Sequence, residues 1–176
     1  MAEGIIGYPF FCPDMIGGGE MGNFLENNVK GVDRELFVRW VQVSALMPMM
    51  QFSYAPWKLD STVNSICRKY AEIHRSLGDY IYSLAIQSSE TGIPIVKPLF
   101  FRNPEDEKTY AISDQFMLGD RFLVAPVLKK GDVSRDIYLP KGTWVDYWDG
   151  KIFQGNTTLQ HYAAPIEKLP IFISIL

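Results

Sequence analysis

Cysteine and histidine are scarce in this sequence, which limits the kinds of site that it can build. The 176 residues include two Cys and two His. Cys12 and Cys67 are too few for a disulfide framework and their spacing fits no zinc pattern, so each is predicted to be a small buried apolar residue. His74 has no second His or Cys at ligand spacing, and His161 is expected among turn residues far downstream. We therefore expect no metal site and no cofactor.

Clusters of positive charge and long apolar runs are also missing. The 17 Lys and Arg are scattered and the formal net charge is -3, so a nucleic-acid partner is not expected. No apolar run approaches the ~20 residues of a membrane span, and Met1 to Glu3 lead into a strand-like segment rather than a signal peptide. Asn156-Thr157-Thr158 matches the N-glycosylation pattern and would suit a secretory-pathway parent, although the sequence leaves the compartment unknown.

What the sequence does have is apolar and aromatic content sufficient for a core, and one stretch that could open a site. The segment Tyr8 to Cys12 is predicted to be a buried strand, which Pro13 and the three glycines from Gly17 to Gly19 bring to an end. Asp14 then stands at the carboxyl end of a parallel strand, where ligands bind in α/β sheets. The alternative is that Asp14 only caps a turn through its side chain.

A second polar position follows a predicted helix that begins near Asp33 and ends before Pro48. In the apolar run after this helix, Gln51 and Ser53 are two residues apart and therefore on the same side of a strand. Buried polar side chains need partners, which either the core or a ligand such as a sugar hydroxyl could supply. Simple exposure at a strand end is the alternative.

The rest of the chain changes its periodicity near Ile93. Residues 60 to 89 have the spacing of one helix, or of two helices broken at Gly78, with Gly92 as the C-terminal cap. The segments after this point predict an antiparallel sandwich of short strands separated by turn signals: 93 to 101, 115 to 118, 121 to 128, 136 to 139, 143 to 148 and 151 to 153.

The order of these motifs resembles glycoside hydrolase family 31 over nearly the whole chain. The residues that carry the resemblance are Pro13 to Gly18, the Glu35 to Trp40 helix, Leu46 to Trp57, Pro98 to Phe101, Asp114 to Asp120, Val124 to Leu128 and Tyr138 to Trp144. The resemblance implies an α/β plus all-β fold: residues 1-92 form the last two β/α units of an eight-stranded β/α (TIM) barrel, and residues 93-176 form an antiparallel β-sandwich that is incomplete at its C-terminus.

The resemblance also implies what the chain does and what it lacks. Retaining glycosidases use two carboxylates ~5 Å apart, and in this family both lie upstream of the region seen here, so no catalytic residue is expected in this chain. The rest of the barrel would come from upstream sequence. The residues implied to bind the carbohydrate substrate are Asp14, Gln51, Ser53 and Trp57.

Two departures from the family pattern bear on specificity. Many α-glucosidases of the family have Arg-Asn-His where this chain has Gln51-Phe52-Ser53, and an aromatic residue where it has Gly19. The Met-Gln-Phe-Ser and Pro-Trp pattern is similar to the myogenesis-regulating glycosidase branch, which implies an α-glycosidase that prefers α-galactosides over α-glucosides. Two other interpretations stay open: a non-catalytic sugar-binding or regulatory protein of the same family, and a sandwich-type interaction module with no sugar site.

Overall fold

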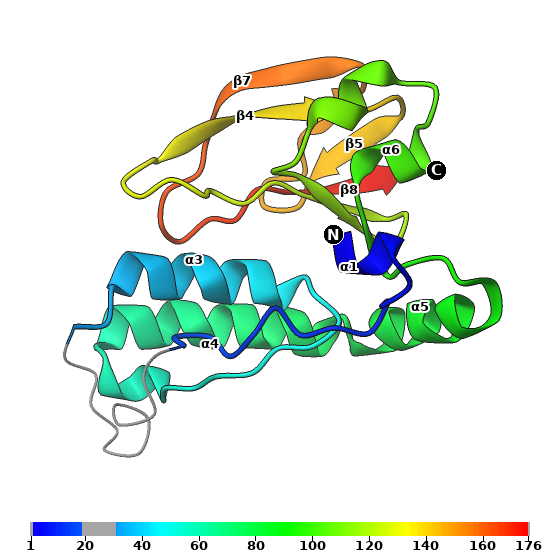
Figure 1. The fold of residues 1–176 in the computed structure, drawn as a ribbon. Coiled ribbons are helices and arrows are strands. Elements are labelled where there is room, and N and C mark those ends of the chain that lie inside the picture. The colour runs from blue at the N-terminus through cyan, green and yellow to red at the C-terminus, as the bar shows by residue number, and fades with distance from the viewer. Residues whose placement is uncertain (1, 19–30, 176) are drawn as a thin grey trace.

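The computed structural model describes residues 2–18 and 31–175. Figure 1 shows two layers, with helices α3, α4 and α5 on one side and a body of β-strands on the other. The helices and strands follow the chain in this order: α1 (Ala2–Ile5), α3 (Arg34–Ala45), η1 (Pro56–Lys58), α4 (Ser61–Ser76), α5 (Gly78–Thr91), β1 (Val96–Lys97), α6 (Leu99–Arg102), η2 (Glu107–Ala111), β2 (Phe116–Leu118), β3 (Phe122–Val124), β4 (Ser134–Leu139), β5 (Thr143–Asp146), β6 (Ile152–Gln154), β7 (Thr157–Ala163) and β8 (Ile171–Ile175).

The helices begin and end where the local chemistry predicts. The side chain of Asp33 caps α3 by accepting a hydrogen bond from the Leu36 backbone N–H, and Asp60 caps α4 in the same way through Val63. Of the two alternatives for residues 60 to 89, the structure has two helices, which meet at Leu77 and Gly78. Gly92 closes α5 in the left-handed conformation (φ 74°), as expected for a C-terminal cap.

A six-stranded antiparallel sheet in the order β1-β2-β3-β8-β5-β6 forms the centre of the molecule. Alternate residues of its central strands β2, β3 and β8 point to opposite sides, and each side packs on a core of its own. Phe116, Leu118 and Val124 belong to the core shared with the helices, whereas Met117, Leu123 and Phe172 belong to a second core. The strands β2 and β3 are therefore apolar at every position.

The second core lies between this sheet and a two-stranded antiparallel sheet, β4-β7. Ile137 and Leu139 of β4 face Trp144, which is fully buried and donates its indole N–H to the Pro140 carbonyl at 2.8 Å. The C-terminal half is thus an antiparallel sandwich, as predicted.

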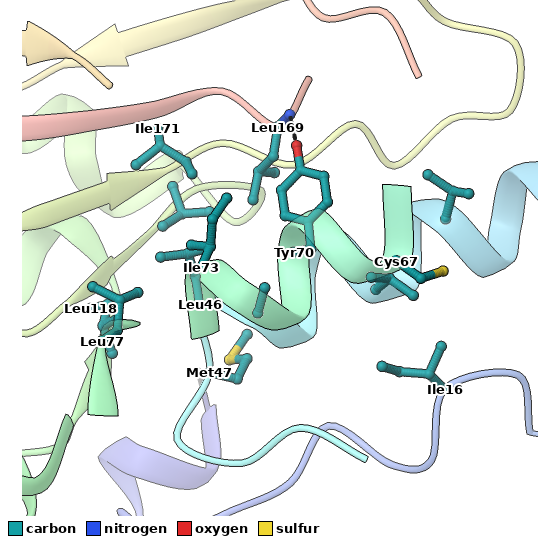
Figure 2. Close-up of a cluster of buried hydrophobic side chains, with 14 of the residues drawn as sticks. Ile16, Leu46, Met47, Cys67, Tyr70, Ile73, Leu77, Leu118, Leu169 and Ile171 are labelled. Atoms are coloured by element: carbon teal, nitrogen blue, oxygen red, sulfur yellow. Dashed lines mark hydrogen bonds between the residues drawn. The ribbon is translucent and has the colours of Figure 1, made fainter. Parts of the chain in front are cut away.

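The helical layer and the sheet share one continuous apolar core (Figure 2). Tyr70 of α4 spans it: its hydroxyl accepts a hydrogen bond from the Leu169 N–H at 2.7 Å and donates to the Glu167 carbonyl at 3.1 Å. We propose that the chain divides into a part of the β/α barrel, residues 1–92, and the sandwich, residues 93–176.

Four expectations about strands are wrong. Tyr8 to Cys12 has no regular secondary structure, with a bend at Phe10, and the side chains of Tyr8 and Phe10 are 66% and 54% exposed rather than buried. The aromatic content predicted burial, but no neighbouring strand among residues 2–18 and 31–175 covers this segment. The second predicted barrel strand, around Gln51, is also absent: in the described part of the chain it is reduced to one parallel bridge, from Phe52 to Ile16, which lies after the first predicted strand.

The other two errors lie in the sandwich. The strand predicted from Ile93 to Phe101 is reduced to Val96–Lys97, because Pro98 has no N–H for a ladder and instead stands at the N-cap of α6. The strand β7 is not among the predicted strands, and His161 lies within it rather than among turn residues. Its φ of 49° falls where the β4–β7 register shifts, and its N–H is held by the Asp136 carboxylate at 2.8 Å, which is the geometry of a bulge.

Candidate functional site

The candidate site is built where the segment after Asp14 runs parallel to the segment after Met49. Two backbone hydrogen bonds join them: Ile16 N–H donates to the Gln51 carbonyl at 2.9 Å, and Ser53 N–H donates to the Ile16 carbonyl at 3.0 Å. Ile16 is fully buried against the helical layer, which fixes the register of the pair. The sequence prediction that these two segments are parallel neighbours is confirmed over this single bridge.

The turn after Ile16 requires glycine. Gly17 has φ 101°, and a Cβ at this position would lie 2.6 Å from the ring of Tyr54 and 2.9 Å from the ring of Phe37. The Ser53 hydroxyl lies against the same turn, 2.8 Å from the Ile16 carbonyl and 3.2 Å from the Gly18 carbonyl. The turn is therefore held by packing and by one side-chain hydroxyl. Gly19 and the predicted loop of residues 20 to 32 lie largely outside the described residues.

Asp14 lies at the surface beside this turn. Its φ is 77°, a left-handed conformation in which Asp is more often found than most residues, and its Oδ1 accepts a hydrogen bond from the Met15 N–H at 2.7 Å. This contact is the local turn-capping role considered as the alternative for Asp14. It occupies one lone pair of a carboxylate that has several, so capping and ligand binding are compatible.

The other three predicted site residues differ in the solvent exposure and hydrogen bonding of their side chains. Gln51 is exposed, and only its backbone carbonyl takes part in the bridge. Ser53 is half-buried, with the hydroxyl proton directed at backbone carbonyls. Trp57 projects from η1 and is 72% exposed. The structure thus brings Ser53 against the Asp14 turn and leaves Gln51 and Trp57 open to solvent.

A hollow of about 440 Å³ lies nearby, between α3 and the chain around Leu128. Both charged and apolar side chains line it: Pro13, Asp33, Glu35, Leu36, Arg39, Trp40, Val43, Val127, Leu128, Lys129 and Lys130. None of the four predicted substrate-binding residues is among them. Its charged rim is tied together, because Lys130 pairs with the Asp33 carboxylate at 2.5 Å and the Gly131 N–H donates to Glu35 at 2.7 Å.

Arg39 is the polar residue of this region that sequence reasoning missed. It is 8% exposed, and its guanidinium donates to the carbonyls of Ala164 (2.9 Å), Asp132 (3.2 Å) and Pro165 (3.3 Å). Burial lowers its pKa from the ordinary value. The signal was present: Arg39 and Gln42 are three residues apart and flanked by buried apolar positions, so both had to lie on the packed side of the helix. They hold the helical layer to the sandwich.

His74 and Cys67 are both engaged in the packing of the helical layer. Residues 2–18 and 31–175 contain no group of three His, Cys, Asp or Glu placed to hold a metal ion. His74 makes its contact with the Ala45 carbonyl at 3.1 Å. Burial raises the pKa of the Cys67 thiol to about 12, which disfavours the thiolate form that nucleophilic attack requires. Among the helices described, none has the length and apolar character to cross a membrane.

Comparison with known proteins accounts for both halves of the chain. The profile of the "Glycosyl hydrolases family 31 TIM-barrel domain" matches residues 1–84, and that of the "Glycosyl hydrolase family 31 C-terminal domain" matches residues 92–174. A solved structure of a family 31 alpha-xylosidase from a soil metagenome, complexed with xylose, superposes with a TM-score of 0.87 at 28% identity, covering 97% of this chain and 28% of that one.

Curated relatives extend well beyond the region compared. The mouse protein named "Myogenesis-regulating glycosidase" is 41% identical over 96% of this chain and 24% of its own length. The "SITS-binding protein" of Tetronarce californica is 36% identical over the same shares of the two sequences. The chain therefore spans about a quarter of the length of these relatives. The resemblance drawn from the motifs is confirmed, and the chain belongs to glycoside hydrolase family 31.

Proposed function

We propose that this chain is the C-terminal portion of a retaining α-glycosidase that hydrolyses terminal α-linked sugars and prefers α-galactosides over α-glucosides. The observation that carries the proposal is the parallel bridge between Ile16 and Phe52, because it sets Asp14 and Gln51 on neighbouring segments with both side chains exposed. The two catalytic carboxylates are assigned to upstream sequence, and neither role is given to Asp14.

The four site residues would contact the sugar in different ways. Asp14 accepts hydrogen bonds from hydroxyl groups, and the amide of Gln51 both donates and accepts. Trp57 offers its exposed ring face to the apolar side of the sugar ring. Ser53 gives its proton to backbone carbonyls of the turn, so it can only accept from a ligand. Its main contribution is to hold the turn that carries Asp14.

The preference for galactosides rests on position 51. A site that hydrogen-bonds a hydroxyl discriminates against the epimer that leaves its groups unpaired, at about 1 to 3 kcal/mol for each partner that the bound sugar covers and leaves unsatisfied. Gln51→Arg restores the α-glucosidase-like residue at one exposed position. The neighbouring positions are less suitable for a test, because Phe52 packs on Phe37 with ring centroids 6.2 Å apart and Ser53 supports the turn.

The experiment uses the full-length protein that contains this chain. In Gln51→Arg, the ratio of kcat/KM for a nitrophenyl α-galactoside to that for the α-glucoside should fall by at least ~10-fold, which corresponds to about 1.4 kcal/mol. Gln87→Arg, at an exposed position of α5, is the matched control and should leave the ratio unchanged. If a folded Gln51→Arg protein keeps the original ratio, position 51 does not distinguish the two sugars.

The second candidate is a non-catalytic sugar-binding or regulatory protein of the same family. The observation that favours it is the relative named for binding SITS rather than for hydrolysis. Upstream sequence separates the two candidates: a strand carrying the nucleophile Asp and another carrying a Gly-Asp-Asn-like acid/base support the enzyme, and the loss of both supports the binding protein. A pure sandwich module fits less well, because the barrel profile matches residues 1–84.

A further inference from the structure

The turn between β6 and β7 carries the triplet Asn156-Thr157-Thr158, which plays no part in the proposed glycosidase site. The triplet satisfies the Asn-X-Thr pattern of an N-glycosylation acceptor. Such patterns arise often by chance, so the folded environment has to be compatible with a large hydrophilic group. Three features of the structure bear on that requirement.

The first feature is exposure. The side chains of Asn156 and Thr158 are both exposed, whereas Thr157 between them is half-buried. This alternation follows from the start of β7 at Thr157, because successive residues of a strand point to opposite sides. The acceptor Asn and the hydroxyl that the pattern requires are therefore on the open side of the strand. A glycan at Asn156 would extend into solvent without displacing core side chains.

The second feature is a fixed backbone. Asn156 has φ 57°, the left-handed conformation that Asn tolerates in tight turns. The preceding Gly155 anchors the turn, since its N–H donates to the Gly142 carbonyl at 2.8 Å and a Cβ there would collide with the Pro140 carbonyl oxygen. The turn is packed against its neighbour on one side and presents Asn156 on the other.

The third feature is the position of the turn in the fold. Figure 1 shows β7 on the outer side of the sandwich, away from α3 and α4. The bridge between Ile16 and Phe52, on which the candidate sugar site is built, packs against that helical layer. A glycan on this turn would therefore cover neither the candidate site nor the surface that joins the helices to the sheet.

We propose that Asn156 is an N-glycosylation site, and hence that the protein passes through a compartment that holds a lipid-linked oligosaccharide donor. In this reaction the Asn156 side-chain nitrogen forms a bond to the anomeric carbon of the oligosaccharide and loses one proton. The bond from that carbon to the lipid diphosphate breaks, and the lipid diphosphate leaves with the bonding electrons. No oxidant or reductant is consumed.

The competing explanation is that Asn156 is present only for its backbone, because Asn suits a left-handed turn and Thr suits a strand. Matched variants separate the two explanations. Thr158→Ala removes the required hydroxyl and keeps Asn156 with its turn; Thr158→Ser keeps the hydroxyl. Thr157→Ala changes the middle position, which the pattern leaves free.

The test expresses the full-length protein from its own start in cells of its source organism, and compares gel mobility before and after treatment with peptide N-glycosidase. Wild type, Thr158→Ser and Thr157→Ala should each carry the modification on this turn, whereas Asn156→Gln and Thr158→Ala should each lose one glycan. Mass spectrometry of the tryptic peptide from Ile152 to Lys168 needs no variant, so it decides the question even if a variant fails to fold. Recovery of this peptide from wild type wholly unmodified would overturn the proposal.

Discussion

The replacement Gly17→Ala tests whether the turn beside Asp14 is fixed by packing as well as by backbone conformation. Two costs add at this position. A non-glycine residue held at φ 101° is strained by about 1 to 3 kcal/mol. The new methyl group would also lie 2.6 Å from the Tyr54 ring, an overpacking that costs about 1 to 3 kcal/mol in a well-filled core. Together they predict a loss of about 2 to 6 kcal/mol in the free energy of unfolding.

Gly92→Ala is the matched control, because Gly92 also has a left-handed backbone (φ 74°) but no atom of the described residues lies within 4 Å of the position that the new methyl group would take, so only the conformational cost applies. Urea denaturation of the purified chain, followed by tryptophan fluorescence, measures both variants. Gly17→Ala should be clearly the less stable of the two. Equal midpoints and slopes for the two variants would refute the argument that Tyr54 and Phe37 close the turn.

The burial and charge of particular groups lead to three more expectations. Burial raises the thiol pKa of Cys67 to about 12, so this cysteine should not react with a thiol reagent at pH 8 until the chain unfolds. The half-buried Cys12 should react in the folded state. Rapid reaction of both thiols in the folded protein would contradict this expectation. The hydrogen bond from Lys130 lowers the pKa of Asp33 below its ordinary 3.8, so the stabilising contribution of this pair should be complete above about pH 4 and lost as pH falls through the lowered pKa. An Asp33→Asn variant should therefore lose less stability in acid than wild type does. Identical stability-against-pH curves for the two proteins would contradict this expectation. The isolated 176-residue chain should not hydrolyse nitrophenyl glycosides, and turnover that Asp14→Asn abolishes would contradict the upstream assignment of the catalytic pair.

Much of the fold can be predicted from the sequence because local chemistry determines it. Asp33 and Asp60 cap helices at the positions their side chains favour, and Gly92 ends α5 where only a residue tolerant of positive φ fits. The sandwich follows from short apolar runs between turns. The strand β7 escapes prediction because three of its seven residues are polar and exposed, as in a turn region, and because its bulge at His161 breaks the alternation.

The candidate site is predictable only in part. The parallel relation of the Asp14 and Gln51 segments can be inferred from family motifs, but the engagement of the Ser53 hydroxyl with the glycine turn depends on a backbone fold that no periodicity encodes. Arg39 looks like an ordinary helix residue in the sequence, since its three carbonyl partners lie about a hundred residues downstream. The exposure of Tyr8 and Phe10 likewise depends on which strands lie beside them.

Hydrolysis of nitrophenyl α-galactoside and α-glucoside by the full-length protein is the decisive assay for the proposed function. We expect turnover of both substrates, a higher kcat/KM for the galactoside, and loss of activity with Asp14→Asn chiefly through a raised KM, since Asp14 binds and orients the sugar rather than reacting with it. A higher kcat/KM for the glucoside would contradict the assigned specificity. Absence of turnover of either sugar by a folded full-length protein would contradict the glycosidase assignment itself.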